Sequence, residues 1–163
     1  MDVLTYAARN GYALETQTLY PLWGTIDPHN RKGIALACAA LGPVYLGVNL
    51  AIADQARIGR VWDTEIPASW GDTTPGSWGA HCLLLWEYGG PDDDDLVTLI
   101  TWGGIQLATW RWLRSRMMEA HGLLWPQLAS PLSGFLSVDD LDAIRAQNAA
   151  FLAGGYHETE KSS

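Results

Sequence analysis

Two stretches of the sequence decide its fold: WGAHCLLLWEY at residues 78–88 and LVTLITWGG at residues 96–104. Both are rich in the apolar, β-branched and aromatic residues that favour strands. Glycines, a proline and four consecutive aspartates separate them at residues 89–95, and these residue types are typical of turns. We therefore expect strands at residues 81–88 and 96–102, paired as an antiparallel hairpin with a long exposed tip.

The residues before this hairpin predict two helices and one more strand. Residues 2–10 carry apolar side chains at helical spacing. A second helix is expected to start at Pro28, with Asp27 as its N-cap, and to stop at Gly42. Residues 44–50 (VYLGVNL) are apolar and β-prone and predict a strand.

The residues after the hairpin predict two further helices. Thr109 is a suitable cap for a helix over about residues 110–121. Ser137 caps the last helix, over about residues 138–153. The apolar positions of that helix form one stripe, made of Leu141, Ile144, Phe151 and Leu152.

This order of elements predicts an α+β fold, an antiparallel sheet with flanking helices. Residues 54–80 are rich in Gly, Pro, Ser, Thr and Asp and are expected to form a long loop. A loop of that length in a compact domain is usually functional or lines a site. We expect one domain over residues 1–155 and a flexible tail at 156–163.

The chain is acidic, with a net charge of -8 over 163 residues and 48% hydrophobic residues. That composition is globular, and an acidic surface without a basic stripe argues against binding to nucleic acid. Arg111, Arg114 and Arg116 cluster at helical spacing. We interpret them as a solvated helix face.

The sequence predicts no metal and no cofactor. The four aspartates at residues 92–95 lack the alternating ligand spacing of a calcium loop and are expected to form a solvated turn. His29, His121 and His157 also lack metal-ligand spacing.

The two cysteines, Cys38 and Cys82, lie in apolar runs and are expected to be buried free thiols in a reducing compartment. No signal peptide is visible, and no apolar run reaches the roughly 20 residues that span a bilayer. We expect synthesis in the cytoplasm and no insertion into a membrane.

Three segments in this order resemble the papain-like cysteine peptidases. They are DVLTYAARNGYALETQTLYPL at residues 2–22, IALACAALGPVYLGVNL at 34–50, and the hairpin strands quoted above. The sequence WGGIQLATWRWL at residues 102–113 is also similar to uncharacterised phage and actinobacterial proteins of this type. The resemblance implies a papain-like half-barrel that lacks the N-terminal helix bearing the cysteine.

In that family the histidine of this strand is the general base, a role that the resemblance assigns to His81. An asparagine two positions before the tryptophan normally orients the imidazole, and Ile100 stands there. Thr101 is adjacent, but it faces the opposite side of a regular strand from Ile100. Trp102 matches the aromatic residue that shields the histidine, and Trp78, Thr101 and Trp102 are the candidate binding residues.

The family's nucleophile has no counterpart in these segments. The cysteine and an oxyanion-hole glutamine belong to a helix that precedes every matched segment. Cys82 neighbours His81, but adjacent strand residues face opposite sides. Cys38 lies on the apolar face of a predicted helix, where burial raises a thiol pKa. Neither cysteine is a credible nucleophile, so we expect His81 to be vestigial in the isolated chain.

Four functions follow as hypotheses. The first is a non-catalytic papain-like domain that binds a partner or has a structural role, which is our preferred interpretation. The second is the His-bearing part of a cysteine peptidase or amidase whose nucleophile comes from another chain. The third is a component of a phage virion, and the fourth is a β-rich binding module unrelated to peptidases. A sheet that lacks its covering helix leaves apolar surface bare, so we expect a protein partner or a homo-oligomer.

Overall fold

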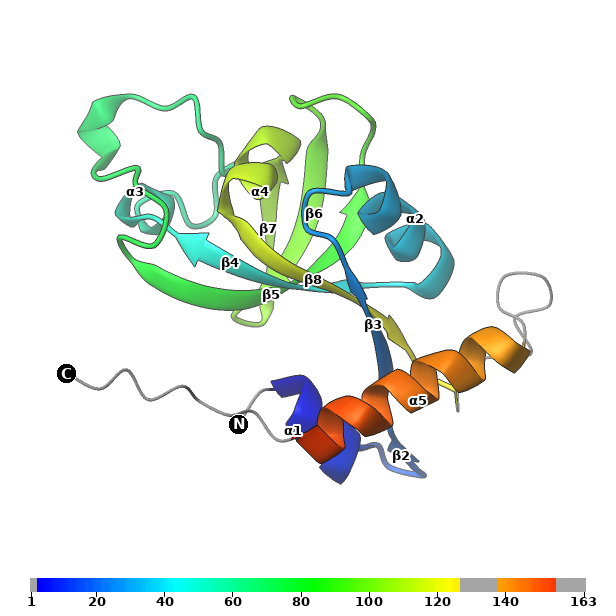
Figure 1. Cartoon of the computed structure of the whole chain (residues 1–163). Coiled ribbons are helices and arrows are strands. Elements are labelled where there is room, and N and C mark those ends of the chain that lie inside the picture. The colour runs from blue at the N-terminus through cyan, green and yellow to red at the C-terminus, as the bar shows by residue number, and fades with distance from the viewer. Residues whose placement is uncertain (1–2, 127–137, 155–163) are drawn as a thin grey trace. The chain divides into compact units, whose positions relative to one another are not determined.

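The computed structural model describes residues 3–126 and 138–154 of the chain, and Figure 1 shows the arrangement of the elements. Within these residues the chain divides into two compact units. The larger unit consists of residues 24–123, and the smaller contains the described parts of the two chain ends. One domain over residues 1–155 stays a prediction.

The larger unit is built on an antiparallel sheet, which confirms the predicted α+β class. Its six strands lie in the order β3-β8-β4-β5-β6-β7. Each strand places alternate side chains on opposite faces, and one face forms the core. The strands are β3 (Leu22–Ile26), β4 (Val44–Leu50), β5 (Gly79–Tyr88), β6 (Leu96–Thr101), β7 (Gly104–Thr109) and β8 (Met117–Leu124).

Two helices, α2 (Arg31–Leu41) and α4 (Trp110–Arg116), supply the other side of this core. We call the sheet face that they cover the inner face and the opposite one the outer face. The inner-face side chains of the strands are buried and include Val44, Leu46, Val48, Leu83, Leu85, Val97 and Leu99. The core is thus aliphatic at the centre of the sheet.

The predicted start of the second helix is wrong. Helix α2 begins at Arg31, and its N-cap is Asn30, whose side-chain oxygen accepts a hydrogen bond from the Gly33 N–H at 2.9 Å. Asp27 Oδ1 instead accepts a hydrogen bond from the His29 N–H, within a turn that precedes the helix. The local hydrogen bond of Asp27 therefore competes with helix capping and delays the helix.

The predicted helix over residues 110–121 is also wrong in its second half. Thr109 caps α4 as expected, because its hydroxyl accepts a hydrogen bond from the Trp112 N–H at 3.2 Å. The helix ends at Arg116, and the chain continues as β8, which pairs antiparallel with β4. Pairing with a central strand of the sheet overrides the local helical preference of these residues.

The long segment at residues 54–80 is more ordered than predicted. It begins within the short helix α3 (Ile52–Gln55) and contains the 3-10 helix η1 (Ala68–Trp70). Trp62 pairs with β7 through a parallel bridge to Ala108 and is completely buried. Trp62 therefore attaches this segment to the sheet, before the chain continues to Trp78 and β5.

The smaller unit contains α1 (Val3–Asn10), the short antiparallel strands β1 (Tyr12–Ala13) and β2 (Thr18–Leu19), and α5 (Val138–Gly154). Asn148 of α5 is buried, and its side chain bonds to both the N–H and the C=O of Trp23, at 2.9 and 2.7 Å.

The apolar stripe predicted for α5 is only partly described. The side chains of Leu141 and Phe151, and the predicted cap Ser137, lie outside the described residues. Ile144 and Leu152 are half-buried, and the buried position between them is the polar Asn148.

Candidate functional site

His81 lies on the inner face of β5, near the start of that strand. Leu83 and Leu85 follow on the same face and are buried, whereas Cys82 is exposed on the outer face. His81 pairs with Val48 of β4. The period of two along a strand thus separates the imidazole from the neighbouring thiol, as the sequence predicts.

Thr101 of β6 holds the imidazole in place. The His81 Nε2 and Thr101 Oγ1 atoms are 2.6 Å apart, and Thr101 is buried. Strand register explains the contact. Leu84 pairs with Ile100, so Thr101 faces the same side as His81 and lies diagonally across from it. The Thr101 hydroxyl therefore supplies the hydrogen bond that Ile100, at the position of the family's asparagine, cannot make.

Trp102 covers the imidazole from the other side. The two rings are stacked, with centroids 4.3 Å apart and planes 18° apart. Thr101 pairs with Gly104, so Trp102 and Gly103 form a two-residue turn with φ values of 48° and 73°. This is the pattern of a type I′ hairpin turn, which normally takes Asn or Gly. A bulky residue at positive φ is strained, and such strain is found most often at functional sites.

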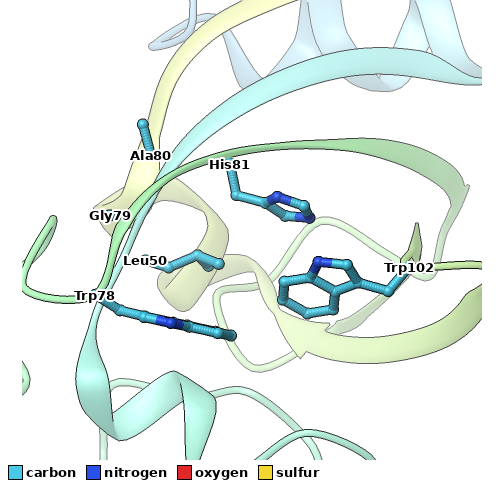
Figure 2. A pocket seen from close by; sticks show the side chains of 6 residues that line it. All are labelled: Leu50, Trp78, Gly79, Ala80, His81 and Trp102. Atoms are coloured by element: carbon cyan, nitrogen blue, oxygen red, sulfur yellow. The ribbon is translucent and has the colours of Figure 1, made fainter.

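A pocket of about 180 Å³ opens beside these rings, lined by Leu50, Trp78, Gly79, Ala80, His81 and Trp102. Figure 2 shows the rings of Trp78 and Trp102 pointing toward one another, with His81 above them. The main chain positions Trp78, because its N–H donates to the Leu50 C=O at 3.0 Å. Trp102 is 53% exposed, so one wall of the pocket remains available to a ligand.

Partial burial of His81 disfavours the charged form of its imidazole. Burial lowers the pKa of His81 below its ordinary value, because a buried site disfavours the charged ring. Nε2 faces Thr101, and no described residue is a hydrogen-bond partner of Nδ1. A neutral ring with one nitrogen engaged can accept or donate one hydrogen bond at the other.

Neither cysteine can act with His81. Cys82 is exposed, which corrects the expectation of a buried thiol, and the Tyr45 hydroxyl donates to its Sγ on the outer face at 2.7 Å. Cys38 is buried, and its Sγ contacts the carbonyls of Leu85 and Trp86. Burial, and then the charge of Glu87, raise the pKa of Cys38. In the described residues the site therefore has a positioned imidazole and no thiol nucleophile.

Sequence reasoning missed a buried ion pair that contacts the tryptophans next to this site. The Asp54 carboxylate accepts hydrogen bonds from Arg116 Nε at 3.0 Å, Trp112 Nε1 at 2.8 Å and the Ala51 N–H at 2.7 Å. Asp54 is 1% exposed and Arg116 is 4% exposed. The interpretation of Arg116 as part of a solvated helix face is thus wrong.

Two tryptophans connect this ion pair to the pocket. Trp62 Nε1 donates to the Asp54 C=O at 2.8 Å, and the Trp62 ring packs against Trp112 with centroids 4.7 Å apart. The Trp62 ring also meets Trp102 edge-on, at 6.3 Å and 88°. The Asp54–Arg116 pair therefore helps to hold the Trp62 ring in place. Trp62 in turn contacts Trp102, which forms one wall of the pocket.

Arginine side chains bind the acidic turn at residues 89–95. Arg111 forms ion pairs with Asp63, Glu65 and Asp94. The sequence predicted a solvated turn and did not predict these ion pairs with arginine.

Two other arginines complete this arrangement. Arg31 and Arg114 both bind Asp93, at 3.1 and 3.0 Å. Across the residues that the structure describes, no group of three or more His, Cys, Asp or Glu side chains could hold a metal ion.

No family model, no curated protein and no solved structure matches the chain. Among the described helices, none has the length and apolar character needed to cross a membrane.

Proposed function

We propose that this chain is a non-catalytic binding domain, with a papain-like relationship, that receives a flat apolar group in the pocket between Trp78, His81 and Trp102. The observation that carries this proposal is Trp102. Its backbone is strained at φ 48° and its ring is half-exposed, although Asn or Gly fits such a turn without this strain. Both are accounted for if the ring must stand beside the pocket as a preorganised wall.

The size and lining of the pocket set the kind of group that it takes. A volume of about 180 Å³ is below the roughly 300–1,000 Å³ of sites that enclose a drug-sized molecule. The pocket therefore suits one ring or one side chain of a larger ligand. Aromatic walls favour a flat apolar group, and the free nitrogen of His81 favours one hydrogen-bonding atom on that group.

Indole is a suitable probe, because it is flat and carries one N–H donor. We expect indole to bind the full chain saturably, as measured by isothermal titration calorimetry. Trp102→Ala should abolish this binding. Trp86→Ala is the matched control, because Trp86 is 51% exposed but does not line the pocket. Equal affinity in the two variants would reject the proposal.

A second candidate is the His-bearing part of a thiol hydrolase whose cysteine comes from another chain. The specific observation in its favour is the His81–Thr101 hydrogen bond under Trp102. That hydrogen bond and the stacked ring hold the imidazole in one orientation, as a general base requires. Because no described thiol approaches His81, we expect an epoxide warhead to label neither Cys38 nor Cys82 rapidly. Fast stoichiometric labelling that His81→Ala removes would favour this second candidate.

A further inference from the structure

Strand β5 extends beyond the end of its neighbour β6. It runs from Gly79 to Tyr88, but its pairing with β6 begins only at Leu84, opposite Ile100. Strand β6 ends at Thr101, where the chain turns into β7. The first residues of β5 are therefore paired with β4 on one side and with no described strand on the other.

The direction of the main-chain groups along β5 follows from the two-residue turn that joins β6 and β7. Thr101 and Gly104 close this turn, so their main-chain groups bond to each other. Hydrogen-bonding direction alternates along a strand, so the main chain of Ile100 faces β5. Its partner Leu84 therefore directs its own N–H and C=O toward β6.

Two residues at the start of β5 offer free main-chain groups on this side. Cys82 and Ala80 lie two and four residues before Leu84, so their N–H and C=O groups point the same way. Among the described residues, no main-chain group bonds to any of these four groups. Both residues are exposed. An open edge of this kind is a template for pairing with another polypeptide.

The pocket of the candidate site lies beside this open edge. Gly79, Ala80 and His81 line it, and Figure 2 shows the Ala80 and His81 side chains on opposite sides of β5. His81 lies between the two residues that have free main-chain groups. In a strand added to β5, the residue opposite His81 directs its side chain to the same face as the imidazole. One side chain of an added strand therefore reaches the pocket.

We propose that β5 binds an extended segment of another protein as an added strand, with an aromatic side chain of that segment in the pocket. The added strand runs antiparallel to β5, as β4 and β6 do. The two residues that flank the aromatic one then exchange hydrogen bonds with Ala80 and Cys82. This inference rests on the proposed function and adds main-chain recognition to the pocket.

Charge and hydrogen bonding favour a polypeptide over other ligands at this edge. The net charge of -8 disfavours both a nucleic acid and a second copy of the chain, and it favours a segment with basic residues. A free aromatic molecule fills a pocket of about 180 Å³ but leaves the four main-chain groups of the edge unpaired. An extended main chain offers donors and acceptors at the same two-residue spacing.

A pentapeptide of sequence Lys-Ala-Trp-Ala-Lys, blocked at both ends, tests this inference on the full chain by calorimetry. We expect it to bind more tightly than indole. N-methylation of either alanine should weaken binding by about fivefold or more, because it removes an N–H donor that faces β5. N-methylation of the tryptophan is the matched control and should have little effect, since that N–H points away from β5. Equal affinities of the methylated and unmethylated peptides would overturn the inference.

A proline variant tests the same hydrogen bonds from the side of the protein. Cys82→Pro removes one free N–H and leaves the pairing with β4 intact, because that N–H faces away from β4. Cys82→Ala is the control, since it keeps the N–H. We expect Cys82→Pro alone to weaken binding of the peptide. Both variants should bind indole as the natural chain does, because Cys82 does not line the pocket. Peptide binding that Cys82→Pro leaves unchanged would contradict the added strand.

Indole separates this inference from the proposed function. If indole binds and the peptide binds no more tightly, the pocket stands and the added strand is rejected. If the peptide binds through its alanine N–H groups to a chain that does not bind indole, the added strand stands and the pocket proposal is rejected.

Discussion

Strand β6 has a turn at each end, and the two turns differ in a way that distinguishes a structural feature from a site. The acidic turn at residues 89–95 holds four consecutive aspartates, yet arginines from α2 and α4 bind it. The turn at Trp102 and Gly103 carries no charge, yet it leaves an aromatic face exposed beside a pocket that His81 also lines. The candidate site is therefore indicated by an exposed aromatic face beside a pocket, and not by the unusual composition of the acidic turn.

The largest expected effect comes from breaking the Asp54–Arg116 ion pair, which is connected to the Trp102 turn through Trp62. Asp54→Ala leaves Arg116 buried without its carboxylate partner. We expect a loss of about 3–5 kcal/mol in the free energy of unfolding, measured by urea denaturation. Asp93→Ala at the acidic turn is the control, since Asp93 is 43% exposed. A loss for Asp54→Ala as small as that of the control would show that the pair does not support the site.

Substitution of Trp102 separates its ring from its backbone strain. Trp102→Ala removes the contacts to His81 and Trp78 but keeps a Cβ at φ 48°. Trp102→Gly removes the same contacts and relieves the strain. We expect the Gly variant to be more stable than the Ala variant by about 1 kcal/mol, although neither should bind indole. A Gly variant no more stable than the Ala variant would contradict the assigned strain.

At the acidic turn the expected effects are smaller. Arg114→Ala removes an ion pair to Asp93 in which the side chains are 59% and 43% exposed. We expect a change of less than about 1 kcal/mol in the free energy of unfolding, and a difference that shrinks as salt is added. Thermal denaturation at two salt concentrations measures it. A large loss that salt does not reduce would mean that this turn matters as much as the other one.

The smallest expected effect is a pH dependence from His81. Burial lowers its folded-state pKa, so the unfolded chain takes up the proton first as the pH falls. The contribution is fully present above the ordinary value of about 6.5 and is lost as the pH falls below it. The difference in stability between the natural chain and His81→Gln should therefore decrease on acidification through this range. An increasing difference would show that the imidazole is stabilised in its charged form.

Much of the larger unit can be predicted from alternation and turn residues. The strand at residues 44–50 and the hairpin of β5 and β6 were predicted because apolar residues are bounded there by Gly, Pro and Asp. The same rule places His81 and Cys82 on opposite faces. Strand β8 was missed, because residues 117–124 take their conformation from pairing with β4 and not from local preference.

The interior of the site could not be predicted, because it depends on contacts between distant residues. The Asp54–Arg116 pair joins positions 62 residues apart, and no local pattern distinguishes Arg116 from Arg114. Thr101 was judged by strand alternation, as the residue that faces the opposite side from Ile100. Its contact with His81 depends instead on the register between β5 and β6. Candidate residues followed from the sequence, and their partners did not.

The most direct test of the binding proposal is an NMR titration of the nitrogen-labelled chain with indole, in which the side-chain N–H signals of its nine tryptophans are followed. The pocket described here predicts saturable shifts for Trp78 and Trp102 and a change in the His81 ring nitrogens. Trp86, which is equally exposed but does not line the pocket, should not move. Shifts at Trp86 alone, or none at Trp78 and Trp102 at saturating indole, would contradict the account.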